Sequence, residues 1–151
     1  MTSTAAGLAF FSPDWAEAAR TAVNAGPSPE VRAAKIERYW EWIERAKSRI
    51  DAVWGLGVSD RPGDGCLLLT LRAGVAEAAE LVALDEGRRR ATYLLAGTTA
   101  SWRELMGGYD VGKSFMYRKL MMEVGDLLRF FQAAYLWTEA LGCIQQVPTR
   151  F

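Results

Sequence analysis

Residues 93–126 read YLLAGTTASWRELMGGYDVGKSFMYRKLMMEVGD, and this stretch supports two incompatible interpretations. Its middle, from Gly107 to Ser114, matches the phosphate-loop pattern of a glycine, four residues and Gly-Lys-Ser. That pattern predicts phosphates held by backbone amides and Lys113, with Mg²⁺ on Ser114. A phosphate loop follows a buried strand, whereas residues 101–106 favour a helical turn. The chain after Ser114 is also too short for the βα units of a nucleotide-binding sheet, so nucleotide binding is the least favoured interpretation.

The second interpretation rests on the order of several residues across the same stretch. They are Gly97, Trp102, Leu105, Gly107, Gly108, Tyr109, Asp110, Met116, Lys119, Leu120, Glu123, Gly125 and Asp126. Together with residues 11–17 and Asn24, this set resembles the sterol carrier protein type two family, in particular its bacterial single-domain members. The chain departs from the family pattern at Arg118, where a glycine is usual before Lys-Leu. It also has one extra residue between Leu120 and Gly125, which indicates a β-bulge or a shifted register.

The resemblance implies a single lipid-binding domain over residues 1–151, of the mixed α/β (α+β) class. It implies a mostly antiparallel five-stranded sheet covered by helices, with an apolar tunnel between the sheet and the C-terminal helix. The implied function is non-catalytic binding and carriage of a hydrophobic ligand: a fatty acyl chain, acyl-coenzyme A, a phospholipid or a sterol-like molecule. Each methylene group taken from water into such a tunnel contributes about 0.8 kcal/mol, so little polar recognition is needed.

The predicted lining of this tunnel consists of apolar side chains from the middle helices, the last strand and the final helix. The ten residues are Trp102, Met106, Phe115, Met116, Leu120, Met122, Val124, Leu128, Phe131 and Tyr135. On the last strand, Leu120, Met122 and Val124 are predicted to share one face, because side chains alternate along a strand. Methionine suits a lining because its flexible thioether adapts to ligands of different shape. The same side chains also suit an ordinary packed core, and the sequence leaves both interpretations open.

Capping residues and periodicity predict the order of the elements. Ser12-Pro13 and Ser28-Pro29 each begin a helix; the first ends near Asn24, and the second runs through Ile43. Strands are predicted over 50–58, 66–72, 75–84, 91–96 and 119–124, a turn over 85–87, and helices over 99–106, 110–117 and 126–141. Asp126 is expected to cap the last helix and Gly142 to stop it. The segment 75–84 is rich in Ala and Glu, which favour a helix, but the resemblance implies a strand.

Composition excludes several function classes. Lys plus Arg and Asp plus Glu number 18 each, and a net charge of zero gives no support for nucleic-acid binding. The chain has no histidine, which excludes Ser–His and Cys–His catalysis. Cys66 and Cys143 lack the spacing of metal or redox motifs, and we expect no metal and no cofactor. Without an apolar run of membrane-spanning length or a convincing export signal, the protein is expected to be cytoplasmic.

Several alternatives remain open at this point. Arg88-Arg89-Arg90 is predicted to be a solvated turn, but it also suits the phosphate of acyl-coenzyme A or of an anionic lipid. The helix over 126–141 is apolar around most of its circumference, so it needs more than one apolar neighbour. The second neighbour is a ligand, a second copy of the chain in a homodimer, or a membrane touched transiently. An enzyme or pathway accessory that holds an apolar metabolite is the remaining alternative.

Overall fold

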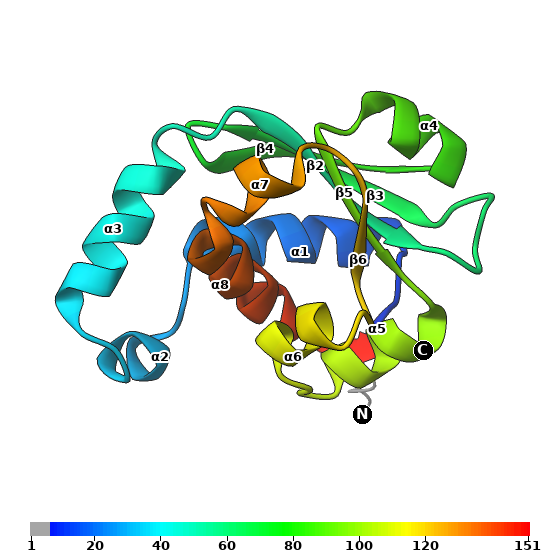
Figure 1. Cartoon of the computed structure of the whole chain (residues 1–151). Coiled ribbons are helices and arrows are strands. Elements are labelled where there is room, and N and C mark those ends of the chain that lie inside the picture. Colours follow the sequence, from blue (N-terminus) through cyan, green and yellow to red (C-terminus); the bar gives the residue numbers. More distant parts are fainter. Residues whose placement is uncertain (1–6) are drawn as a thin grey trace.

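Figure 1 shows the computed structural model of the chain, which describes residues 7–151. The strands of the central sheet are β2 (Ala52–Val58), β3 (Cys66–Arg72), β4 (Val75–Val82), β5 (Tyr93–Gly97) and β6 (Met121–Val124). Their order is β4-β3-β2-β5-β6, with β2 and β5 parallel and the other neighbours antiparallel. The prediction of a mostly antiparallel five-stranded sheet is confirmed, including the strand assignment of residues 75–82.

Helices cover both faces of this sheet (Figure 1). On one face lie α1 (Pro13–Ala25) and α8 (Ala134–Gln145), and on the other lies α4 (Leu84–Arg90). Alternate residues of β3 point to opposite faces: Leu67 and Leu69 join the main core, whereas Leu68 packs in a smaller cluster with Leu84 of α4. The two apolar layers explain why β3 reads as a continuous apolar run.

The serine caps behave as the sequence predicts. The side chain of Ser12 accepts a hydrogen bond from the Trp15 amide at the start of α1, and that of Ser28 accepts from Val31 at the start of α2 (Pro29–Ala33). Short strands β1 (Leu8–Ala9) and β7 (Thr149–Arg150) pair in parallel, a contact that the sequence did not predict. Pairing across so large a sequence separation has no local signal.

The predicted second helix is in fact two helices. It breaks after α2 and resumes as α3 (Glu37–Lys47), which lies at one side of the molecule next to α8 (Figure 1). The indole N–H of Trp40 donates a hydrogen bond to the Arg32 carbonyl at 2.8 Å across the break. A tertiary arrangement of this kind overrides the good helix propensity of Ala34 and Lys35.

The predicted final helix is also divided, into α7 (Leu127–Phe131) and α8. In a continuous helix, Phe130 and Trp137 would be separated by a rise of about 10 Å. Here their rings stack with centroids 4.9 Å apart, and the Trp137 indole donates to the Phe130 carbonyl at 2.9 Å. This contact requires the chain to turn between the two residues. Gly142 lies inside α8, so the prediction that it stops the helix is wrong.

The predicted turn over 85–87 is part of α4. Acidic residues occupy its first turn and three arginines its last, the arrangement that the helix dipole favours. Gly87 allows α4 to approach β3 closely, because a Cβ atom there would lie 2.3 Å from the sulfur of Cys66. The charge pattern was therefore a helix signal that the turn interpretation overlooked.

A bulge separates the side chains of the last strand. Leu94 pairs with Val124 but Leu95 pairs with Met122, so Glu123 is the extra residue. The bulge predicted from the sequence is confirmed, and it reverses the alternation of faces. Met122 packs against the main core, whereas Val124 packs in the cluster beneath α4. The prediction that Leu120, Met122 and Val124 share one face is therefore wrong for Val124.

Arg118, just before β6, occupies a backbone conformation that favours glycine. Its φ is 58°, in the left-handed region, which costs a non-glycine residue about 1–2 kcal/mol. We expect Arg118→Gly to raise the free energy of unfolding by about 0.5–1 kcal/mol, because relief of this strain exceeds the added chain entropy of glycine. Urea unfolding measures the change. Arg45→Gly, inside α3, serves as the control and is expected to lower stability by about 1 kcal/mol; a loss of stability for both variants would contradict the strain argument.

Candidate functional site

The phosphate-loop motif does not form a phosphate loop. It connects α5 (Thr99–Met106) to α6 (Val111–Met116), so it follows a helix and not a strand. Asp110 caps α6 by accepting from the Lys113 amide at 2.9 Å. Ser114 is buried, and its hydroxyl donates to the Asp110 carbonyl at 3.2 Å, so it is not available to Mg²⁺. The phosphate-loop interpretation of this motif is therefore wrong.

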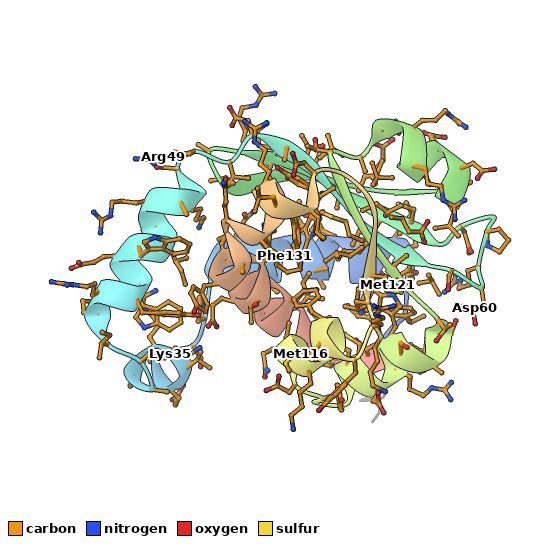
Figure 2. The ribbon with its side chains drawn as sticks, in the orientation of Figure 1. Lys35, Arg49, Asp60, Met116, Met121 and Phe131 are labelled. Atoms are coloured by element: carbon orange, nitrogen blue, oxygen red, sulfur yellow. The ribbon has the colours of Figure 1, made fainter. Side chains whose placement is uncertain are left out.

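Large apolar side chains are exposed along α6 and α7, and we call this surface the apolar face. Its members are Met116, Tyr117, Leu127, Leu128 and Phe131. Met116 and Leu128 are the most exposed, at 74% and 73%. Figure 2 shows Met116 of α6 and Phe131 of α7 on one side of β6. Met121 instead pairs with Ala96, which faces the α4 side of the sheet. Large exposed apolar patches often mark a binding site.

Three of the predicted lining residues lie at the surface of the main core. Met106, Phe115 and Met122 are half-buried and pack against that core. The ring of Phe115 meets that of Phe131 edge-on, with centroids 6.0 Å apart, and Phe131 in turn meets Phe130 at 5.3 Å. Side chains from α6 and α7 therefore meet at the surface of the main core.

The other predicted lining residues have different surroundings. Trp102 and Leu120 are fully buried in the main core, and the Trp102 indole donates to the Gly57 carbonyl at 2.8 Å. Val124 lies on the opposite side of the sheet, beneath α4. Tyr135 is exposed and lies against α3, where its ring contacts those of Tyr39 and Trp42.

A second hollow, which the sequence analysis missed, lies beneath α3, and we call it the α3 pocket. It has a volume of about 230 Å³. Apolar side chains that line it include Trp40 and Ile43 of α3, Trp54 of β2, and Leu136 and Trp137 of α8. These residues belong to segments far apart in the chain, so only the folded structure brings them together.

One buried donor beside the α3 pocket lacks an acceptor. Trp54 is fully buried, and its indole N–H has no hydrogen-bond partner within residues 7–151. The buried indoles of Trp15, Trp40, Trp102 and Trp137 each donate a hydrogen bond. A buried N–H without an acceptor costs about 1–3 kcal/mol, so the fold gives up stability next to this pocket.

A polar contact holds α3 against α8 at the edge of the α3 pocket. Lys35 forms a salt bridge with Glu139 of α8, and the Tyr39 hydroxyl donates a hydrogen bond to the same carboxylate. Burial, followed by the hydrogen bond to Glu139, raises the pKa of Tyr39 above its ordinary value. Tyr39 is thus a neutral hydrogen-bond donor that holds α3 in position.

Two of the three consecutive arginines of α4 form salt bridges on the protein surface. Arg88 forms salt bridges with Asp85 and Glu123, and Arg90 forms them with Glu80 and Glu86. The interpretation of this run as a turn that meets phosphate is therefore not favoured.

Neither cysteine is in the reactive thiolate form near neutral pH. Cys66 and Cys143 are free and buried, and burial raises the pKa of each thiol to about 11, so both remain protonated near neutral pH. Within residues 7–151, no helix is both long and apolar enough to cross a bilayer.

Comparison with solved structures identifies the fold. A crystal structure of sterol carrier protein 2 superposes with a TM-score of 0.67 at 22% sequence identity, covering 91% of this chain and 98% of that chain. A conserved hypothetical protein of Thermus thermophilus, described as a possible sterol carrier protein, superposes with a TM-score of 0.67 at 21% identity. That match covers 99% of this chain and 96% of the Thermus protein. No family model and no curated protein sequence matches the chain. The chain therefore has the fold of sterol carrier protein 2, as the resemblance in its sequence predicted.

Proposed function

We propose that this protein binds a hydrophobic ligand without catalysis and carries it through the cytoplasm. The ligand class is the one the sequence predicted: fatty acyl chains, acyl-coenzyme A, phospholipids or sterol-like molecules. The observation that carries the proposal is the apolar face, where Met116, Leu128 and Phe131 are exposed and the ring of Phe131 contacts the half-buried Phe115. The shared fold with sterol carrier protein 2 supports the same function.

In this proposal the ligand lies between the apolar face and the main core. Met106, Phe115, Met122 and Phe131 contact its chain, and Met116 and Leu128 lie at the entrance. Trp102 and Leu120 support the lining from the core, and Tyr135 lies at its far edge. Val124 is left out because it packs beneath α4. A ligand there would cover apolar surface that is otherwise in water, and this burial supplies the affinity.

Native mass spectrometry of freshly purified protein tests this function directly. We expect the spectrum to contain a species heavier than the chain by the mass of a lipid, which organic extraction followed by mass spectrometry then identifies. The apo protein, obtained by extraction, should bind the neutral apolar dye Nile red with increased fluorescence. A protein with no co-purifying lipid and no dye binding would contradict the proposal.

The apolar face is also the surface through which we propose that the carrier touches a membrane transiently or pairs with a second copy. Sedimentation velocity separates these contacts. If the protein is a monomer at all concentrations, membrane contact is the only one of the two that remains. A mass that doubles as the concentration rises would indicate the homodimer.

A further inference from the structure

A further hollow lies beside the α3 pocket, and we call it the arginine cleft. It has a volume of about 700 Å³ and lies between α3 and the α7–α8 turn. Arg45 and Arg49 enter its lining from α3 and the residues that follow it, and Arg129 from α7. Figure 2 shows Arg49 at the end of α3 nearest the sheet. The volume is within the range of about 300–1,000 Å³ that is typical of small-molecule sites.

The three guanidinium groups of the arginine cleft are not neutralised by the protein. Arg45, Arg49 and Arg129 form no salt bridge with any residue between 7 and 151. Five other arginines do pair with acidic side chains: Arg20, Arg61, Arg72, Arg88 and Arg90. Asp51 is the acidic residue in the cleft lining, and its carboxylate accepts a hydrogen bond from the Ala73 amide. The cleft therefore concentrates positive charge in a protein whose formal net charge is zero.

The arginine cleft and the α3 pocket lie next to each other and share part of their apolar lining. Ile50 and Trp137 line both hollows, and Tyr93 and Ala133 complete the apolar part of the cleft floor. Arginine forks match the planar oxygens of carboxylates and phosphates, whereas the α3 pocket offers mostly apolar side chains. A ligand that matches both hollows needs an anionic end and an apolar body.

We propose that the arginine cleft and the α3 pocket together form a second binding site, which takes a small amphiphile with a carboxylate or phosphate group. The oxyanion contacts Arg45, Arg49 and Arg129, and the apolar chain lies over Ile50 and Trp137 into the α3 pocket. This site is distinct from the apolar face and adds a head-group specificity that the proposed function does not need. Residues 88–90, the candidate anion site in the sequence, differ from this cleft because Arg88 and Arg90 are paired with acidic side chains.

Isothermal titration calorimetry with matched probes tests the second site on the full chain. The probes are decanoate, decyl phosphate, neutral decan-1-ol and inorganic phosphate, with the two anionic amphiphiles kept below their micelle-forming concentrations. We expect both anionic amphiphiles to bind about tenfold more tightly than decan-1-ol, the combined contribution of three exposed charge contacts. This preference should decrease with added salt, because exposed charges are screened. Binding of inorganic phosphate as tight as that of decyl phosphate would overturn the amphiphile proposal.

The triple variant Arg45→Gln, Arg49→Gln, Arg129→Gln tests the head-group contacts. It should remove the tenfold preference and leave the affinity for decan-1-ol unchanged. The control triple variant Arg38→Gln, Arg89→Gln, Arg118→Gln removes the same charge from exposed arginines outside both hollows, and it should retain the preference. Equal effects of the two triple variants would overturn the proposal. The proposal would also be overturned if the first triple variant lost binding to anionic phospholipid vesicles but still bound the monomeric amphiphiles with the same preference. That result would indicate a membrane contact.

The outcome is separable from that of the proposed function. If Nile red binds but the anionic amphiphiles show no preference over decan-1-ol, the second site fails and the carrier function stands. If co-purifying lipid and Nile red binding are both absent while the arginine-dependent preference remains, the carrier function fails and the second site stands.

Discussion

Replacing Phe131 with Asp is expected to weaken Nile red binding at least about thirtyfold and to eliminate co-purifying lipid. The side chain of Phe131 is 41% exposed, and its ring contacts Phe115 and Phe130. The substitution removes an aromatic surface and introduces a carboxylate that must lose water when a ligand covers it. The combined loss is roughly 2 kcal/mol or more. Met122→Glu, on the neighbouring strand β6, should have a similar effect for the same reason. Dye titration and native mass spectrometry measure both variants.

The matched control is Phe151→Asp, because Phe151 is also a phenylalanine and is 42% exposed. It lies away from the apolar face, against Phe10 and Arg103. Its dye affinity should remain within about twofold of the parent protein. Circular dichroism of all three variants should retain the signal of the sheet, since Phe131 is already partly in water. Unchanged lipid retention in Phe131→Asp and Met122→Glu would mean that the ligand site is not at the apolar face.

Elements with strong local signals were predictable from the sequence. Ser12, Ser28 and Asp126 cap helices as predicted, and their hydrogen bonds involve residues three positions away. The strand over 66–72 and the helix over 99–106 have the predicted bounds. In each case the residues that determine the element lie within one helical turn or one strand of each other. The rest of the fold therefore has little influence on that element.

Breaks in helices were not predictable because distant residues cause them. The turn between α7 and α8 allows Phe130 and Trp137 to stack. The break between α2 and α3 allows Trp40 to reach the Arg32 carbonyl and Lys35 to reach Glu139. Neither segment contains a proline or glycine at the break, so a pattern of apolar residues alone predicts one long helix in both places.

Only part of the candidate site was predictable, because distant residues contribute to the rest. Periodicity and the family resemblance identified apolar residues such as Phe115 and Phe131, whose rings are in contact in the structure. The bulge at Glu123 moved Val124 to the other face, although the sequence contained the extra residue that produced it. The arginine cleft had no sequence signal, because Arg45 and Arg129 are more than eighty positions apart.

Stability of the domain is expected to depend strongly on Trp137. This side chain is fully buried at the point where the sheet, α7 and α8 meet. Its ring contacts Trp54 of β2 at 4.9 Å, Tyr93 of β5 at 5.8 Å and Phe130 of α7 at 4.9 Å, measured between centroids. Truncation of such a side chain leaves a cavity that the surrounding rings cannot fill without losing their own contacts.

We therefore expect Trp137→Ala to lower the free energy of unfolding by about 3–5 kcal/mol, a large part of the roughly 5–15 kcal/mol that stabilises a typical domain. Trp137→Phe should lose less, because a ring remains and only the hydrogen bond to the Phe130 carbonyl and part of the volume are removed. Trp42→Ala is the matched control, since Trp42 is 38% exposed on α3, and it should cost less than about 1 kcal/mol. Thermal and urea unfolding give the order. Losses of similar size for Trp137→Ala and Trp42→Ala would mean that the aromatic cluster around Trp137 does not hold the sheet against α7 and α8 as the structure indicates.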